Sequence, residues 1–538
     1  MPDILRRTTA LAVLLIVTGT ATARTAPPPP IIATPDSAWL RLKLAPERLT
    51  GLARLWYHSD VEPGEALLLL GAAYTINAIR VDGQPAVWRE TAAPGDSSDR
   101  DPAPATWRAV RALRVTLPAT APPRSSARVV EIAYDGAHQA QAPWSFLLRP
   151  GDLFHPLAPG TSLAWRVELP GVDAATVAGN LVAVGAGYRT PRPVAALYLL
   201  GALHPLEWRA VGETRLACLA PPGETTPPAT WDRLMRLLER ARGDWGPYPW
   251  PTLVIVPDPA RGDRPRAYPG VIETGPVAEG VAGDAALLHE ILHGWFGLGV
   301  AAPPRGDWSE GLCALLADHD LRAADTPAAA AHFRRGLLRR FTALAGTPAD
   351  VPLRDYAPGD TVTDVVGYGK GLFFFLELRR ELGETRFVAG LRRLQSRHGG
   401  GQADWSDLFR CFPADASGDL VSFFTAWLDR PGGPRLAAEN ASYDRARREV
   451  RVDICQRAAA TGLRSGPPPA PWPLHVRLRL DGLSSSPVMV ALDRAERTCR
   501  LPAATMPTAV TADPFWETFR LLDDPDPPRA PLGGSSGR

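Results

Sequence analysis

Residues 285–296 read AALLHEILHGWF, and His289 to His293 form the pattern His-Glu-x-x-His. In an α-helix, residues four apart share a face, so both imidazoles can reach one metal ion. Glu290 can act as general base on water at that metal. We expect a buried helix over 285–296, capped by Asp284. A core helix with two incidental histidines is the alternative, but an unpaired buried Glu290 would be costly in it.

A third ligand is needed, because catalytic zinc is held by three protein groups and leaves a fourth position open. Glu310 lies in the stretch DWSEGL (307–312), which follows a turn rich in proline and glycine. The run WSEGLCALLADHDL predicts a second, antiparallel helix that returns Glu310 to the metal. The alternative is an ordinary glutamate in a first helical turn, where the helix dipole favours it. The sequence thus predicts one Zn²⁺ ion bound by His289, His293 and Glu310.

HEILHGWFG followed by DWSEGL resembles the gluzincin family of zinc aminopeptidases typified by membrane alanyl aminopeptidase and leukotriene hydrolase. The spacer of 16 residues between His293 and Glu310 is shorter than the family's usual one, which shortens a loop without removing a ligand. Glycyl aminopeptidases, a related gluzincin family, are the nearest alternative. The resemblance implies a thermolysin-like α+β catalytic domain that acts on peptides.

The stretch VGYGKG (366–371) matches the family's Tyr-x-Lys-Gly, which opens a helix that continues here as LFFFLELRREL. The resemblance implies that Tyr368 donates a hydrogen bond to the oxyanion. A phenol placed there stabilises developing negative charge. A half-buried tyrosine at a helix start is the alternative. Lys370, one of only two lysines in the chain, is expected to be a solvated helix residue or part of this motif.

The segment GVIET (270–274) stands where the family carries Gly-x-Met-Glu-Asn on an edge strand. By resemblance, Gly270 and Glu273 are substrate-binding residues, and Glu273 holds the free amino terminus of the substrate. Ile272 and Thr274 depart from the family pattern. A solvated glutamate at a strand edge is the alternative for Glu273. If Glu273 has no such role, the prediction of a metallohydrolase survives while that of an exopeptidase weakens.

These residues together predict a zinc-dependent aminopeptidase that hydrolyses the N-terminal peptide bond of peptides. Two alternatives stay open at this point. The first is a zinc metalloendopeptidase or other amide hydrolase. The second is a noncatalytic binding protein stabilised by zinc, which would need neither Glu290 nor Tyr368.

The 538 residues exceed one ordinary domain and suggest about three. Short apolar runs between Gly, Pro and Asp predict β structure at both ends of the chain, around a mostly helical middle. We expect an N-terminal β domain (37–205), the catalytic domain (206–435) and a small C-terminal β-sandwich (436–524). The remaining expectations are a linker (24–36), a surface loop (92–106) and a disordered tail (525–538).

Residues 1–23 look like a signal peptide, with an arginine pair, a short apolar run and an A-x-A-like cleavage site. The apolar run is too short for a stable membrane span. We expect an exported protein, periplasmic or secreted, with tethering by an uncleaved segment as the alternative. The net charge of +2 argues against nucleic-acid binding. Cys455 and Cys499 are the best candidates for a disulfide, and the oligomeric state is left open.

Overall fold

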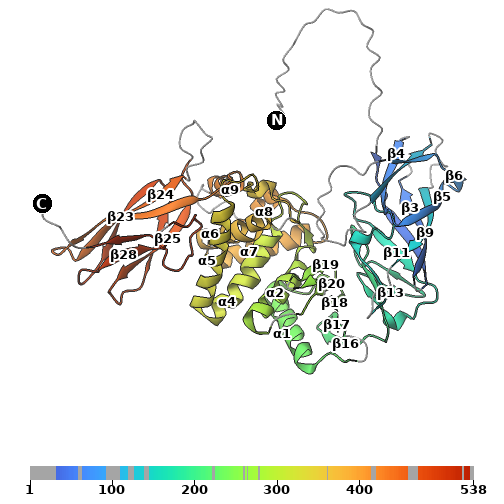
Figure 1. Cartoon of the computed structure of the whole chain (residues 1–538), viewed down its shortest axis with the longest axis horizontal. Coiled ribbons are helices and arrows are strands. Elements are labelled where there is room, and N and C mark those ends of the chain that lie inside the picture. Colours follow the sequence, from blue (N-terminus) through green and yellow to red (C-terminus); the bar gives the residue numbers. More distant parts are fainter. Residues whose placement is uncertain are drawn as a thin grey trace, which may run out of the picture.

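The chain forms a β-rich N-terminal region, a mostly helical middle and a C-terminal β region (Figure 1). This computed structural model describes residues 32–532 except 46, 59–63, 92–109, 119–126, 139–143, 221–223, 259–260, 263, 277–278, 360–361, 413–419, 459–469 and 524–525. The expected signal peptide and surface loop lie outside these residues. Among the described helices, none is long and apolar enough to cross a membrane.

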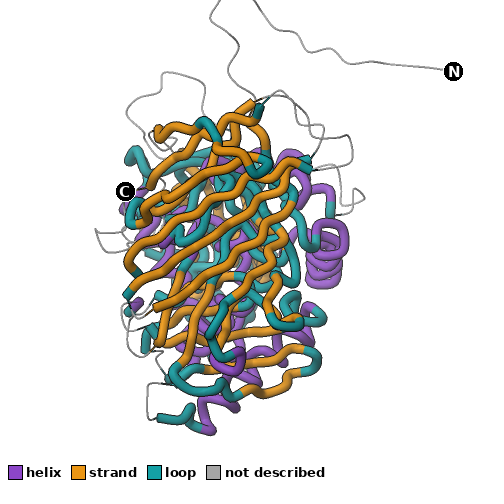
Figure 2. The backbone as a smooth tube through the Cα atoms, turned by 90° about the vertical axis from the view of Figure 1, so that its right-hand side faces the viewer, coloured by secondary structure: helices purple, strands orange, loops and turns teal. Residues whose placement is uncertain are grey.

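Alternation of buried and exposed side chains builds the N-terminal sheets, and β3 (Arg48–Tyr57) buries every second residue. Figure 2 shows the long strands of the largest sheet side by side. Its other strands are, in spatial order, β13 (Val182–Val184), β14 (Gly187–Arg189), β11 (Ala164–Glu168), β2 (Ser37–Ala45), then beyond β3 the strands β9 (Arg128–Ala137), β5 (Tyr74–Val81) and β6 (Gln84–Pro85). The two smaller sheets contain β1 (Ile32–Ala33), β4 (Gly64–Gly71), β8 (Val110–Leu117) and β7 (Trp88–Thr91), and β10 (Trp144–Leu148), β15 (Leu199–Ala202) and β12 (Val177–Gly179).

The middle region begins with a five-stranded mixed sheet. Its order is β16 (Trp208–Val211), β17 (Thr214–Cys218), β18 (Thr252–Pro257), β20 (Val271–Thr274) and β19 (Arg266–Tyr268). The three strands β17, β18 and β20 are parallel, whereas β19 runs antiparallel to β20 and forms the edge. The helix α1 (Pro228–Trp245) connects β17 to β18 and packs against α2 (Gly280–His293). The edge strand β19 contacts α2, so this edge of the sheet lies beside that helix.

The rest of the middle region is helical. After the short pair β21 (Phe296–Gly297) and β22 (Val300–Ala301) come α3 (Ser309–Cys313), α4 (Asp320–Asp325), α5 (Pro327–Leu344), α6 (Gly371–Leu382), α7 (Glu384–His398), α8 (Trp405–Arg410) and α9 (Leu420–Leu428). Two π-helical turns interrupt this pattern, one between α3 and α4 and one directly before α6. Both turns carry residues of the site described below.

The helix α2 starts earlier than the sequence suggested. It begins at Gly280, and Glu279 occupies its N-cap position, so the prediction that Asp284 caps the helix is wrong. The Asp284 carboxylate instead pairs with Arg233 of α1, 2.5 Å away. This ion pair joins the outer faces of the two helices, while the apolar face of α2 is buried.

The C-terminal region contains two sheets in contact with each other. One has β23 (Pro434–Asp444), β24 (Glu449–Ala458) and β27 (Glu496–Pro502), and the other has β26 (Val488–Leu492), β25 (Leu474–Asp481), β28 (Ala509–Ala512) and β29 (Arg529–Pro531). Two terminal expectations are wrong. The expected disordered tail includes β29, which pairs with β28, and the expected linker includes β1, which pairs with β4.

The expected disulfide is also wrong. All five cysteines lie in the described part of the chain, and each is a free thiol. Across the β24–β27 ladder, Cys499 pairs with Val452 and Cys455 pairs with Glu496. The two cysteines are therefore offset by three residues, about 10 Å along the ladder, on opposite faces of the sheet. A shared sheet brought them near each other, but the register separates their sulfur atoms.

Candidate metal centre

The side chains of His289, His293 and Glu310 converge on one point and could hold a metal ion. The two histidine Nε2 atoms are 3.1 Å apart, and Oε2 of Glu310 lies 3.3 Å and 3.4 Å from them. All three side chains are largely buried. The helix α2 presents both histidines on one face, and α3, which packs against α2, presents the glutamate.

The tautomers of both histidines suit metal binding. Nδ1 of His289 lies 2.7 Å from Oδ2 of Asp318, and Nδ1 of His293 lies 3.0 Å from the carbonyl oxygen of Phe296. Each Nδ1–H donates a hydrogen bond to its acceptor, and this tautomer leaves the Nε2 lone pair directed toward the glutamate. Two imidazole nitrogens and one carboxylate are a donor set that Zn²⁺ accepts. The residues present therefore fit a zinc ion.

Asp318, which orients His289, was not anticipated from the sequence. In a regular α-helix, residues eight apart differ by roughly 80° in direction. The π-helical turn Ala314–His319 inserts an extra residue, which brings Asp318 back to roughly the face of Glu310. Arg322 supports the aspartate, since its Nη1 lies 2.6 Å from the Asp318 carbonyl oxygen and 3.3 Å from Oδ1. No pattern of regular helical spacing could have identified this partner.

Glu290 lies beside the ligands but does not belong to the metal-binding group. Its side chain is buried, and burial raises the pKa of its carboxyl group above the ordinary value. The backbone N–H of Ala267, on the edge strand β19, donates a hydrogen bond to this carboxylate and opposes that effect. A carboxylate with a raised pKa is suited to accept a proton near neutral pH.

Tyr368 lies on the π-helical turn Val365–Lys370, and its ring stacks on the imidazole of His289. The ring centroids are 5.3 Å apart, with an angle of 14° between the planes. The hydroxyl hydrogen-bonds the side chain of Glu310. Burial, together with the charges of Glu310 and Glu290, raises the pKa of this phenol well above its ordinary value. Tyr368 therefore stays protonated and can donate a hydrogen bond inside the site.

Two glycines let the Tyr368 turn approach α3. A Cβ atom added at Gly311 would lie 2.6 Å from the carbonyl carbon of Gly371, closer than such atoms pack. Seen from the other side, a Cβ at Gly371 would lie 3.1 Å from the Cα of Gly311. The missing side chains allow α3 and α6 to touch backbone to backbone. This contact brings Tyr368 next to Glu310.

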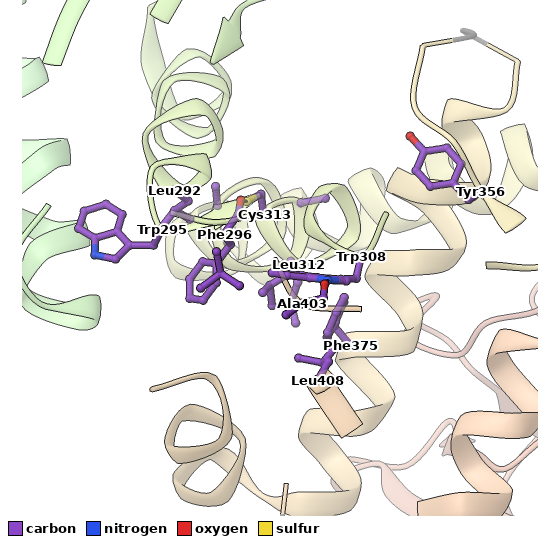
Figure 3. Packing of buried hydrophobic residues seen from close by; sticks show 14 of the residues in the cluster. Leu292, Trp295, Phe296, Trp308, Leu312, Cys313, Tyr356, Phe375, Ala403 and Leu408 are labelled. Carbon is purple, nitrogen blue, oxygen red and sulfur yellow. Dashed lines mark hydrogen bonds between the residues drawn. The ribbon is translucent and has the colours of Figure 1, made fainter. Parts of the chain in front are cut away.

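A hydrophobic core holds α3 in place behind the metal ligands. Trp308 and Leu312 are each two residues from Glu310 and so point roughly away from it, and Figure 3 shows them packed with Phe375 and Leu408. The indole N–H of Trp308 donates to the carbonyl oxygen of Ala403 at 2.8 Å, so the buried ring is also fixed in orientation. Glu310 thus projects from a helix whose opposite face is anchored by close packing.

Glu273 is not on an edge strand and is not solvated, contrary to the sequence-based description. It lies on β20, between β18 and β19, and is completely buried. Ile272 packs into the core that includes α2, so by strand alternation Glu273 points to the other face, toward the N-terminal region. Its carboxylate is not part of the group formed by His289, His293 and Glu310. Gly270, with φ of 71°, makes the tight turn from β19 to β20.

The Glu273 carboxylate is already fully engaged. Oε1 accepts hydrogen bonds from Nε of Arg149 at 2.5 Å and from the Tyr198 hydroxyl at 2.7 Å. Oε2 accepts from Nε of Arg261 at 2.8 Å. Burial opposes ionisation, but the two guanidinium groups hold the pKa of this carboxyl below its ordinary value. Binding of a substrate amine by Glu273 stays a prediction, and it would require this network to rearrange.

We expect Glu273→Gln to destabilise the fold by about 3 kcal/mol, because it leaves two partly buried guanidinium groups with Asp258 as their remaining carboxylate partner. Chemical denaturation would measure the change in the free energy of unfolding. Glu168→Gln is the matched control, since Glu168 forms an exposed pair with Arg41 and should cost less than about 1 kcal/mol. Equal stability of the two variants would contradict a structural role for Glu273.

The sequence matches no protein-family model.

Proposed function

We propose that this protein is a zinc-dependent hydrolase of peptide or amide bonds. The observation that carries the proposal is the convergence of three zinc-type ligands with a buried carboxylate, Glu290, and a protonated phenol, Tyr368. A zinc ion that only stabilises a fold is normally enclosed by four protein ligands and needs neither a base nor an oxyanion partner. The noncatalytic alternative is therefore the weaker one.

The surrounding architecture supports the proposal of a thermolysin-like α+β catalytic domain. A mixed sheet with an antiparallel edge strand packs beside α2, and the third ligand comes from a helix that follows. We also propose that the C-terminal region is a small β-sandwich, which agrees with the contacts of β23 with β28 and β29. Export of the chain to the periplasm or the exterior stays a proposal based on the sequence of residues 1–23.

The mechanism assigns each residue a separate task. His289, His293 and Glu310 would hold Zn²⁺, which supplies Lewis acidity and lowers the pKa of water at the site. Glu290 accepts the proton of the attacking water and later returns it to the leaving amine. Tyr368 donates a hydrogen bond to the oxygen that becomes negative in the transition state. Asp318 keeps His289 in the tautomer that binds metal.

Aminopeptidase action is the narrower proposal. It is based on the position of the segment 270–274 shortly before α2, the helix that carries both histidines. A second candidate, a metalloendopeptidase or other zinc amide hydrolase, is favoured by one observation. Glu273, the residue expected to hold the substrate amine, is occupied by Arg149, Arg261 and Tyr198. The two candidates share the chemistry at the metal and differ only in whether a free amino terminus is required.

We expect hydrolysis of an aminoacyl arylamide by the zinc-loaded protein, loss of this activity on chelation and its return with Zn²⁺. The same substrate with an acetylated amine separates the two candidates. An aminopeptidase should lose about 10- to 100-fold in kcat/KM, because a charged hydrogen bond contributes roughly 1.5–3 kcal/mol. An endopeptidase or general amide hydrolase should lose little. Failure to cleave either form, or any member of a peptide library, would overturn the proposed function.

A further inference from the structure

Lys370 is completely buried, so the alternative of a solvated helix residue is wrong. Its ammonium group donates a hydrogen bond to the carbonyl oxygen of Arg430, just after α9. It also lies 5.0 Å from the ring centre of Trp472 and 5.9 Å from that of Phe519. Both aromatic residues belong to the C-terminal part of the chain. One side chain from the middle region is thus enclosed by groups that follow it by 60 residues or more.

This burial is costly for an ammonium group. Lysine is rarely buried without a carboxylate partner. Desolvation lowers the pKa of Lys370 to about 7, while the charge of Asp350 opposes this effect and that of Arg430 adds to it. The Asp350 carboxylate is engaged elsewhere, since it accepts the backbone N–H groups of Gly346 and Gly432. An apolar side chain of similar length would avoid this desolvation penalty. What lysine adds at this position is its hydrogen bond to the Arg430 carbonyl oxygen and the contacts of its ammonium group with the two aromatic rings.

The position of Lys370 connects these contacts to the metal centre. Lys370 closes the π-helical turn Val365–Lys370, and Tyr368 lies two residues before it. Residues two apart on a helix point in roughly opposite directions. Tyr368 faces His289 and Glu310, whereas Lys370 faces the C-terminal aromatic residues. The turn therefore contacts the candidate metal-binding residues through Tyr368 on one side and the C-terminal region through Lys370 on the other.

We propose that Lys370 is a positioning residue that joins the turn carrying Tyr368 to the C-terminal β region. The C-terminal region then contributes to the site without touching it, by fixing where the phenol lies. This role rests on the proposed function only for the statement that Tyr368 assists hydrolysis. The mechanical link between Lys370 and the turn stands independently of any activity.

Lys370→Met tests the link through kinetics. We expect kcat to fall about 10- to 100-fold with KM nearly unchanged, because a small displacement of an oxyanion partner costs this much. Lys43→Met is the matched control, since Lys43 is the only other lysine and lies exposed on β2. In a Tyr368→Phe background, Lys370→Met should change kcat less than about twofold, because the group it positions is gone. Equal losses in both backgrounds, or no loss in kcat, would overturn the proposal.

Hydrogen exchange provides a readout that needs no activity. Backbone amides of residues 365–370 should exchange faster in Lys370→Met than in Lys43→Met, with the rest of the middle region unchanged. An unchanged exchange rate in this turn would overturn the mechanical link. If the exchange rate of this turn rises in Lys370→Met, but neither the natural protein nor any variant hydrolyses an amide, the mechanical link is supported and the proposed function is wrong.

The natural chain allows a third measurement if Lys370→Met fails to fold. With only two lysines, labelling at the ε-carbon gives two side-chain signals, and Lys43 serves as the reference. We expect the Lys370 signal to titrate at a distinctly lower pH than the Lys43 signal. Coincident titration of both signals would show that Lys370 is exposed and would overturn the proposal.

Discussion

Glu290→Gln is expected to reduce kcat by about 100- to 10,000-fold, the range for loss of a general base. Glutamine has nearly the shape of glutamate but cannot accept a proton from water. Glu290 is not among the three metal-binding groups, so zinc content should stay at the level of the natural protein. Steady-state kinetics and metal analysis of the purified variant would measure both quantities.

The pH profile adds a second test of Glu290. Burial raises the pKa of its carboxyl group, and only the ionised form can act as a base. Activity should therefore rise with pH through this raised pKa, and the variant should lack that limb of the profile. Glu279→Gln is the control, because Glu279 is exposed at the start of the same helix. A Glu290→Gln protein that keeps more than a tenth of the activity would refute the mechanism.

Glu310→Gln is the second change with a large expected effect, because it replaces a charged ligand by a neutral amide. Zinc binding to structural zinc-finger sites is worth about 10–16 kcal/mol through four protein ligands, or about 3–4 kcal/mol per ligand. Loss of Glu310 should therefore cost on the order of 4 kcal/mol, or about 1000-fold in zinc affinity. Competition with a chelator of known affinity would measure this loss. Activity at limiting zinc should fall in parallel.

Asp318→Asn provides a graded comparison, because it changes only the partner of a ligand. Removal of such a partner typically weakens metal binding 10- to 100-fold. A larger effect for Asp318→Asn than for Glu310→Gln would contradict the assigned ligand set. Affinity should also fall with falling pH in the natural protein. Burial disfavours protonation of His289, but Asp318 and Glu310 raise its pKa well above the ordinary value, so zinc must displace protons.

The two histidines of the candidate metal centre could be predicted from sequence because regular helical spacing puts them on one face, whereas Glu310 rested on a second, antiparallel helix predicted after the turn. Residues four apart on α2 must share a face, and the structure brings both histidines together with Glu310. Asp318 escaped prediction because a π-helical turn changes the spacing after Glu310. The environment of Glu273 escaped it for another reason. Its partner Arg149 lies 124 residues earlier in the chain, and nothing in either local segment indicates that they meet.

The regions of the fold were predictable to a similar degree. Strands with alternating buried residues, such as β3, follow directly from the pattern of apolar side chains. Strands of two or three residues do not, and β1 and β29 were taken for linker and tail. Register was equally inaccessible, since Cys455 and Cys499 were the best candidates for a disulfide but lie three residues out of register on neighbouring strands. Both failures concern pairing between distant segments.

The backbone contact between Gly311 and Gly371 makes the position of Tyr368 sensitive to a single added carbon. Every other amino acid carries a Cβ atom, and at Gly311 that atom would meet the backbone of the neighbouring helix. Alanine at position 311 would leave both histidines, Glu290 and Glu310 unchanged, so the sequence pattern of the candidate metal centre would be the same. The turn that carries Tyr368 would have to move away from α3, so one added carbon beside Glu310 in the chain would alter the candidate site without changing any of these residues.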